Sequence, residues 1–332
     1  KKKYNIYKNN FKDKKINVYN NFNNLSKILR KKIDYSINSI SGISGLEPTL
    51  KIIPFTKNIL IANKETIICG WDLINKNLKK YKTFFIPIDS EHYSIWELIK
   101  NEDNNNIEKI ILTASGGPFL NTSKKRLINI NPNIAIKHPN WKMGKKISID
   151  SSTMMNKVYE YIEAKKIFKL KKNKISILVH PSSYIHAIIF LKGNIIKLLA
   201  HEPKMTIPIS NALNIRESLN ERLILKNIKN LNELSFSLPN KNKFPLLSVI
   251  NLIPEESSNF ETILITLNDS LVDKYLNGKI NYLSITKNLL TLIKSPFLLK
   301  YYKLKPKSIY DIKKMIEITK NYLDKNLKHY AK

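Results

Sequence analysis

Short apolar runs that alternate with helical segments constrain this chain more than any other feature. Three such runs lie at 58–62, 84–88 and 109–113. Runs that are apolar on both faces are typical of parallel strands buried between helices. A helix is expected to begin at 63–65, between the first two runs, and to extend past Leu78. The sequence therefore predicts an α/β protein.

The rest of the chain divides by its pattern. A small-residue turn at 41–45 precedes a helical segment at 46–53, and the first 38 residues fit a short strand and a helix. We expect a helix from Ser151 to about Phe168, a strand at 175–179, and two more strands within 185–199 around Gly193. Residues 214–242 are polar and irregular enough to be a linker. The pattern from Phe244 onward is helical.

The formal net charge of +31 raises the possibility of nucleic-acid binding. Only four of the 57 basic residues are Arg, whereas surfaces that read bases or clamp phosphates favour the planar Arg fork. Lys, Asn and Ile dominate the composition, and they share A/T-rich codons. The simpler explanation is therefore that mutation in an AT-biased genome has added lysines at solvent-exposed positions. A basic nucleic-acid-binding protein remains an alternative.

Several classes of protein are disfavoured by simple counts. No stretch approaches the roughly 18 uninterrupted apolar residues of a membrane helix, and the first residues lack the apolar core of a secretory signal. The one cysteine, Cys69, excludes an intrachain disulfide and a cysteine zinc cluster, and we expect it to be buried. A length of 332 residues allows two or three domains.

An acidic cluster follows the second apolar run. Asp89, Ser90, Glu91 and His92 stand where a strand is expected to end, which is where open α/β sheets place ligands. On an extended chain the carboxylates of Asp89 and Glu91 would share one side. Two such oxygen donors suit Mg²⁺ or Mn²⁺. The alternative is a solvated acidic turn.

The segment 151–160 combines hydroxyls, an amide, a lysine and a carboxylate. Ser151 or Ser152 can cap the expected helix, and a helix N-terminus of this kind is a natural phosphate site. Helical spacing lets Asn156, Lys157 and Glu160 face one ligand, and Glu160 could complete a metal site with the acidic cluster. The alternative is a capped amphipathic helix with a surface ion pair.

Three further features are weaker on their own. The glycines after Ser115 would let backbone N–H groups approach an anion, although a plain turn looks the same. A loop with His138, Trp141 and Met143 could close over a substrate, or its Trp could fill a small core. His186 is a candidate ligand contact or a structural histidine. Neither a GxGxxG nor a Walker loop occurs in the sequence.

At these motifs the sequence resembles the 1-deoxy-D-xylulose 5-phosphate reductoisomerases of the non-mevalonate isoprenoid pathway. The resemblance is strong over about 40–205 and weak elsewhere. Its motifs occur in the family's order. The matching stretches are 45–50, 61–65, 87–92, 113–119, 138–144, 150–157, 160–164 and 180–186.

The resemblance implies a role for each matched residue. It implies divalent-metal ligands at Asp89, Glu91 and Glu160. It implies a substrate-phosphate site at Ser115, Ser151, Asn156 and Lys157, with further substrate contacts at Lys64, Ser90, Glu91, His138, Glu160 and His186. It implies NADPH contacts at Asn63, Glu65 and Gly144, and a substrate lid at Trp141 and Met143. Within this set, the implied catalytic residues are Lys64, Glu91, His138 and Glu160.

The resemblance also implies an architecture and a reaction. The expected parts are a partial Rossmann-like NADPH-binding domain over 1–88, an α/β catalytic domain over 89–213, the linker over 214–242 and a helical domain over 243–332. The reaction would rearrange and reduce 1-deoxy-D-xylulose 5-phosphate to 2-C-methyl-D-erythritol 4-phosphate, with NADPH and Mn²⁺ or Mg²⁺ (or Co²⁺). The resemblance also implies a homodimer. The AT-biased composition fits a bacterial cytoplasmic protein, with a plastid protein as the alternative, and we expect neither nucleic acid nor a membrane as partner.

Four departures from the family's pattern limit these expectations. The strand–turn–helix with the Gly-rich cofactor loop is expected to be missing from the chain. Val158 stands where the family usually has Gly, and Lys204 where an acidic residue usually precedes Met205. The Asn-rich C-terminal signature is reduced to 267–269. An inactive relative that binds a sugar phosphate but lacks the cofactor loop is therefore a second alternative.

Overall fold

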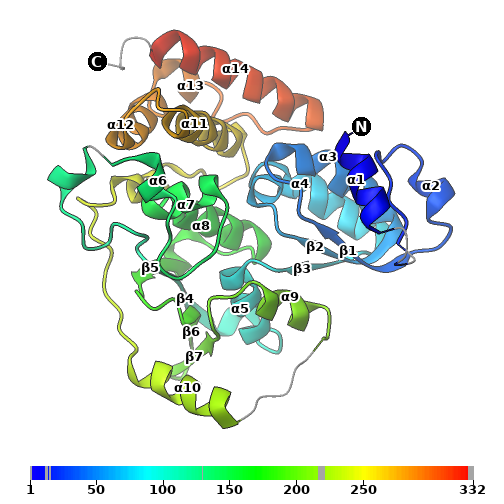
Figure 1. Cartoon of the computed structure of the whole chain (residues 1–332), viewed down its shortest axis with the longest axis horizontal. Helices are drawn as coiled ribbons and strands as arrows, with labels where there is room; N and C mark the ends of the chain where they lie inside the picture. The colour runs from blue at the N-terminus through cyan, green and yellow to red at the C-terminus, as the bar shows by residue number, and fades with distance from the viewer. Residues whose placement is uncertain (1, 12–13, 15, 129, 216–220, 328–332) are drawn as a thin grey trace.

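The computed structural model describes residues 2–11, 14, 16–128, 130–215 and 221–327. The strands form two sheets, one of three strands and one of four. The two sheets lie on opposite sides of the fold, and the C-terminal helices form a layer across one end of both (Figure 1). The predicted mixed α/β architecture is confirmed.

The three-stranded sheet is parallel and contains the first two apolar runs. Its strands are β1 (Ile33–Asn38), β2 (Thr56–Ile61) and β3 (Phe84–Pro87), in that order. Residues 59–61 are fully buried, because α3 (Leu46–Ile52) and α4 (Lys64–Tyr81) connect the strands and cover the sheet. The register aligns Asn38 with Ile61 and Ile61 with Pro87. The carboxyl ends of all three strands therefore meet at one edge.

The four-stranded sheet is mixed. Its central strand β4 (Ile107–Ala114) pairs in parallel with β5 (Ile175–Val179) and antiparallel with β6 (Ile185–Leu191). The edge strand β7 (Ile195–Ala200) follows β6 through the predicted hairpin, in which Gly193 has a φ of 77°. Ala114 aligns with Val179, so the segments after β4 and β5 also leave the sheet at one edge.

Helices join the two sheets into one core. α5 (Ser90–Leu98) packs on β6 and β7, and α8 (Met155–Ile167) packs on α4, β4 and α7 (Lys145–Ser152). α11 (Asn259–Leu276) contacts α4, α7, α12 (Tyr282–Leu292) and α14 (Ile309–Leu327). The largest cluster of buried apolar side chains runs through all of these parts. The predicted domain boundaries stay a prediction.

The remaining helices are mostly short and peripheral. They are α1 (Lys2–Asn10), α2 (Leu25–Ile28), α6 (Pro132–Ala135), α9 (Thr206–Ala212), α10 (Glu221–Asn232) and α13 (Pro296–Leu299). The expectation of an irregular linker over 214–242 is wrong for α10, whose apolar residues recur at helical spacing; 216–220 lie outside the described residues. None of the helices in the described part combines the length and apolar composition needed to span a bilayer.

Two helices replace the single one expected from Ser151. α7 ends at Ser152, and α8 begins at Met155 after Met154 adopts a left-handed conformation with a φ of 63°. Ser151 and Ser152 therefore lie in the last turn of α7 and cap neither helix. The segment Ser-Thr-Met-Met has no Gly or Pro to mark this break, which is why the sequence pattern missed it.

Candidate active site

A cavity opens where the carboxyl ends of β2, β3 and β4 face one another. Strands that end at one edge bring the segments after them together, although these lie far apart in the sequence. The cavity contains all the residues for which the resemblance implied a metal, substrate or lid role. Its lining includes Lys64, Asp89, Ser90, Glu91, Ser115, His138, Trp141, Met143, Ser151, Asn156, Lys157, Glu160 and His186.

Three carboxylates converge on one point of this cavity. Oxygen atoms of Asp89, Glu91 and Glu160 all lie within 4.8 Å of one another. Asp89 is the N-cap of α5, where its Oδ1 accepts from the backbone N–H of Glu91 at 3.3 Å. The extended spacing expected for Asp89 and Glu91 is therefore wrong, because a helix begins between them. Glu160 comes from α8 and is 1% exposed. The convergence and the oxygen chemistry fit a divalent cation.

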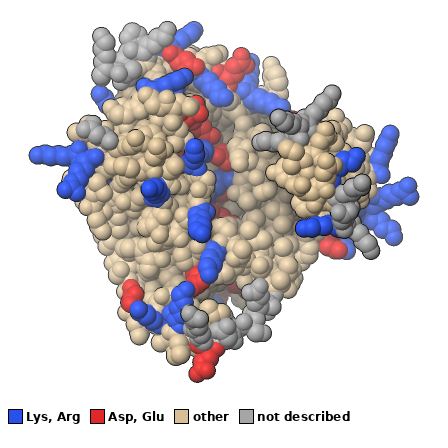
Figure 2. Space-filling model, in the orientation of Figure 1, with Lys and Arg blue, Asp and Glu red and all other residues tan. Residues whose placement is uncertain are grey.

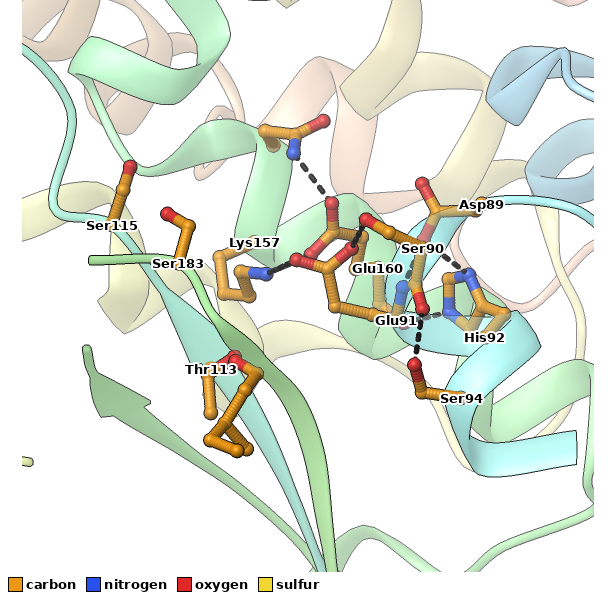
Figure 3. A network of polar contacts seen from close by, with 12 residues as sticks. Asp89, Ser90, Glu91, His92, Ser94, Thr113, Ser115, Lys157, Glu160 and Ser183 are labelled. Carbon is orange, nitrogen blue, oxygen red and sulfur yellow. Dashed lines mark hydrogen bonds and ion pairs between the residues drawn. The ribbon is translucent and has the colours of Figure 1, made fainter. Parts of the chain in front are cut away.

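Two lysines hold these carboxylates together. Lys157 Nζ lies 2.7 Å from Glu91 Oε1 and also pairs with Glu160 (Figure 3). Lys64 Nζ pairs with Asp89 and lies 3.2 Å from Glu160 Oε1. Asn156 Nδ2 donates to the same Glu160 oxygen at 2.5 Å. The two ammonium groups therefore neutralise part of the negative charge of the carboxylates, as a bound cation would.

His92 and Glu163 belong to this network, although no role was predicted for either. His92 Nδ1 lies 3.0 Å from Asp89 Oδ1, and its Nε2 lies 2.9 Å from the backbone oxygen of Glu160. Glu163 Oε2 lies 3.5 Å from Lys64 Nζ. The available signal was helical spacing: each residue stands three positions after a predicted metal ligand. Four carboxylates thus meet three basic side chains.

Burial and the neighbouring charges shift the pKa values of Asp89 and Glu160 in opposite directions. Burial raises the pKa of Asp89, but the charges of Lys64 and His92 outweigh it and hold that pKa well below its usual range. For Glu160, burial and the charge of Glu91 raise the pKa despite Lys157 and Lys64. Glu160 is therefore the more costly carboxylate to ionise. A divalent cation among the three oxygens would relieve that cost.

Hydroxyl groups lie across the cavity from the carboxylates. Figure 3 shows Ser115 and Ser183 on the far side of Lys157 from Asp89 and His92. Ser115 Oγ accepts from the backbone N–H of Gly117 at 3.1 Å. Gly117 has a φ of 66°, and a Cβ there would lie 2.8 Å from the backbone oxygen of Ser151. A glycine at 117 thus lets the loop after β4 close onto the end of α7.

The histidine loop is held in one conformation by hydrogen bonds. His138 Nδ1 accepts from the backbone N–H groups of Asn140 at 3.1 Å and Trp141 at 3.0 Å, so its proton is on Nε2. That nitrogen lies 3.1 Å from Ser115 Oγ. Burial lowers the pKa of His138 to about 4. A neutral His138 therefore presents an N–H donor toward the hydroxyl side of the cavity.

His186 lies on β6 and packs between the ring of His201 and Trp141 of the histidine loop. Its ring packs 3.8 Å from His201 and 5.9 Å from Trp141, measured between centroids. Its Nε2 lies 3.1 Å from the backbone oxygen of His201. Burial and the neighbouring His201 lower the pKa of His186 to about 4. His186 is thus placed to support Trp141, a role that sequence spacing did not suggest.

The residues predicted to contact the cofactor line a second, adjoining cavity. Asn63, Glu65 and Gly144 contribute to its walls, and Lys64 and Asn156 are shared with the first cavity. Asn63 caps α4 by accepting from Thr66 N–H at 2.7 Å, which fixes the first turn of that helix. The cap therefore places Lys64 and Glu65 toward the two cavities.

Lys146 ties three segments together beneath this second cavity. Its Nζ lies 2.5 Å from Glu65 Oε1, 3.5 Å from Asp150 Oδ2 and 2.9 Å from Asp269 Oδ1. These partners come from α4, α7 and α11. Asp150 also accepts from Asn268 Nδ2 at 2.7 Å. The reduced signature at 267–269 therefore still contributes to the packing around the cavity.

The two other departures from the family's pattern are accommodated locally. Val158 is fully buried in the core, where a β-branched side chain packs among neighbours. Lys204 is exposed and pairs with Glu202 at 2.6 Å. Neither side chain lines the catalytic cavity.

Comparisons with known proteins agree with this geometry. Family models match at residues 1–70 (1-deoxy-D-xylulose 5-phosphate reductoisomerase), 85–168 (its C-terminal domain) and 201–322 (DXP reductoisomerase C-terminal domain). The 1-deoxy-D-xylulose 5-phosphate reductoisomerase of Pelagibacter ubique is 51% identical over 92% of this chain and 79% of its own length. That of Wolbachia pipientis (strain wPip) is 41% identical over 79% of this chain and 68% of its own.

Solved structures give the same result. A DOX-P reductoisomerase in complex with NADPH, fosmidomycin and magnesium superposes with a TM-score of 0.85 at 28% identity, over 98% of this chain and 85% of that one. The enzyme from Zymomonas mobilis in complex with NADPH gives 0.81 at 29% identity, over 96% and 81%. The chain therefore belongs to the 1-deoxy-D-xylulose 5-phosphate reductoisomerase family.

Proposed function

We propose that this chain converts 1-deoxy-D-xylulose 5-phosphate to 2-C-methyl-D-erythritol 4-phosphate, using NADPH and a divalent cation. The observation that carries the proposal is the convergence of Asp89, Glu91 and Glu160 in one cavity with the hydroxyl and lysine groups expected to hold a phosphate. A relative with this name is 51% identical to the chain over 308 aligned residues, and a neighbouring structure contains NADPH and magnesium.

Asp89, Glu91 and Glu160 would hold the cation. A bound Mg²⁺ or Mn²⁺ would act as a Lewis acid that polarises the substrate's carbonyl and stabilises negative charge during rearrangement. Lys64 and Lys157 hold these carboxylates close together, because each ammonium bridges two of them. The site is thereby preorganised, which lowers the reorganisation needed on binding.

The hydroxyl side of the cavity would hold the substrate's phosphate. Ser115 and Ser151 supply hydroxyl donors there, and the amide of Asn156 and the ammonium of Lys157, which contact the carboxylates in this structure, would turn to the phosphate oxygens that such donors recognise. Anchoring the phosphate away from the reacting carbons would orient the substrate and supply part of the catalytic energy. Ser90, His138 and His186 would complete the substrate contacts.

The adjoining cavity would take the nicotinamide cofactor. Asn63, Glu65 and Gly144 line it, and the two cavities meet at Lys64 and Asn156. A hydride donor and a substrate must come into contact, so adjoining cavities are what a reduction requires. Trp141 and Met143 lie on the loop that borders the catalytic cavity. They would close over the substrate and exclude water.

A homodimer is the assembly we propose. The edge strand β7 has only one strand neighbour among the described residues, and its Ile195, Ile196 and Leu198 are 54%, 55% and 43% exposed. An apolar edge strand of this kind is a template for pairing with another chain. A second copy would cover it.

Bacterial homologues support a bacterial cytoplasmic protein, with a plastid as the alternative.

The alternative functions predict different behaviour. On the face in Figure 2, the basic side chains of the described residues lie at the periphery and in a column interleaved with acidic ones, so these residues form no continuous basic patch there for a nucleic acid. An inactive relative would bind the sugar phosphate without consuming NADPH. Titration calorimetry with the substrate, followed by an NADPH oxidation assay on the same preparation, separates that relative from an active enzyme.

A further inference from the structure

A third cavity lies beside the catalytic one and has no role in the proposed chemistry. Its volume is about 600 Å³, and it lies between the loop after β4, the segment 240–245 and α12. Apolar walls dominate, with Phe119, Leu127, Phe244, Tyr282 and Leu290 among them. A concave, mostly apolar space of this size with a few polar groups is typical of small-molecule sites.

The charged side chains that line this cavity are basic. Among the described residues, Lys243 and Lys287 are its charged members, and no Asp or Glu lines it. Lys243 donates to the backbone oxygen of Leu120, and Lys287 is exposed on α12. Asn240 and Asn242 add amide groups near Lys243. The chemistry that complements these walls is a small organic molecule with an apolar body and an anionic group.

The third cavity and the catalytic cavity share a wall. Ser115 lines the catalytic cavity, whereas Phe119, four residues later in the same loop, lines the third one. At the end of α7, Ser151 lines the catalytic cavity, and Ser152 and Thr153 line the third. The wall that holds the predicted phosphate contacts is therefore only one loop and one helix turn thick.

Close packing connects the two sides of this wall. The rings of Phe119 and Tyr282 meet edge to face with centroids 5.2 Å apart, and Tyr282 Oη donates to Ser152 Oγ at 3.0 Å. Gly117 lies so near Ser151 that a Cβ would be 2.8 Å from its backbone oxygen. A packed wall does not deform continuously, so a molecule that braces one side stabilises the arrangement on the other.

We propose that the third cavity binds a small amphipathic organic anion, and that this molecule and the phosphorylated substrate bind cooperatively through the shared wall. An occupant that contacts Phe119 and Ser152 stabilises the arrangement in which Ser115 and Ser151 face the catalytic cavity. Linkage then requires each molecule to raise the affinity of the other by the same factor. The cooperative half of this inference rests on the proposed function, and the binding half does not.

The binding half is tested with naphthalene sulfonate as the probe and uncharged naphthol as its neutral counterpart. Leu283→Trp fills the cavity from α12, and Lys287→Gln removes a charge at its edge. We expect both changes to weaken sulfonate binding at least fivefold in titration calorimetry, and Lys287→Gln to leave naphthol binding unchanged. Thr291→Trp, on the exposed side of α12 and outside the lining, is the matched control. Thermal unfolding checks that each variant folds.

Cooperative binding is tested on the wild-type chain with substrate and without NADPH, so that no turnover occurs. We expect saturating substrate to lower the Kd of the sulfonate at least twofold, and the sulfonate to lower the substrate's Kd equally. Undiminished binding to Leu283→Trp would overturn the assigned site, and competition with substrate would place the probe in the catalytic cavity. Independent binding would overturn the coupling. Failure of the substrate itself to bind would instead overturn the proposed function, and the Leu283→Trp comparison would still decide the site.

Discussion

Replacing Glu160 by Gln tests the assignment of the metal site most sharply. The change keeps the shape of the side chain and removes one of three converging negative charges. Glu160 is buried, so solvent cannot replace the lost charge. Lys157 keeps Glu91 as a partner, and Lys64 keeps Asp89 and Glu163. We therefore expect a folded variant with weakened binding of the cation.

The expected size of the effect follows from the spacing of the oxygens. At an effective dielectric constant of 20, two opposite unit charges about 4 Å apart attract by about 4 kcal/mol, and a carboxylate and a divalent cation by about twice that; each 1.4 kcal/mol is roughly a factor of ten. The amide oxygen of Gln recovers part of this as a neutral ligand. We predict a loss of roughly 10²–10³-fold in affinity for Mn²⁺ and a comparable loss in turnover. Stability should fall by only about 1–3 kcal/mol, because each lysine keeps a partner.

Glu163→Gln is the matched control for this prediction. Glu163 lies one turn further along α8, is equally buried, and contacts Lys64 and His92 without joining the three converging oxygens. Its loss should weaken Mn²⁺ about tenfold, as for residues that support metal ligands. Calorimetric titration with Mn²⁺ gives both affinities. Equal losses in the two variants, or an unchanged Kd in Glu160→Gln, would refute the assignment of Glu160 as a ligand.

Three further predictions follow from other parts of the structure. Lys146→Met leaves three carboxylates without their shared cation and should lower the free energy of unfolding by about 1–3 kcal/mol in urea, whereas Lys146→Arg should restore most of it. Burial and His201 lower the pKa of His186 from its ordinary value of 6.5 to about 4 in the folded chain, so the free energy of unfolding should fall by up to about 3 kcal/mol as the pH falls through this window. The fall should be smaller in His186→Asn, and an equal fall in both would contradict this. Ile196→Asp should convert a dimer to a monomer in light scattering, and an unchanged mass would exclude β7 from the interface.

Local pattern was enough to predict most of the secondary structure. The runs at 58–62, 84–88 and 109–113 correspond to β2, β3 and β4, because strands buried on both faces need continuous apolar sequence. The start of the helix after Asn63 could be predicted from this N-cap residue. The break at Met154 was not, because a left-handed methionine is stabilised by the packing of α7 and α8 and leaves no mark in the sequence.

The candidate site was predictable as far as its motifs extend. Asp89, Glu91 and Glu160 were predicted as metal ligands because carboxylates at strand ends and helix starts suit metal chemistry and because the family's motifs match there; the structure brings their oxygen atoms together. Lys146 and Asp269 escaped notice, because their contact joins segments more than a hundred residues apart. Only the folded chain shows such pairings, since sequence spacing carries no information about contacts between α7 and α11.

The most direct test of the account is turnover by the purified chain. 1-Deoxy-D-xylulose 5-phosphate and NADPH would be supplied with Mg²⁺ or Mn²⁺, and again with a chelator in place of the metal. NADPH oxidation would be followed by absorbance, and the product would be identified by mass spectrometry. We expect metal-dependent NADPH consumption, matched one to one by formation of 2-C-methyl-D-erythritol 4-phosphate. Substrate binding without NADPH consumption, at saturating metal and cofactor, would contradict it.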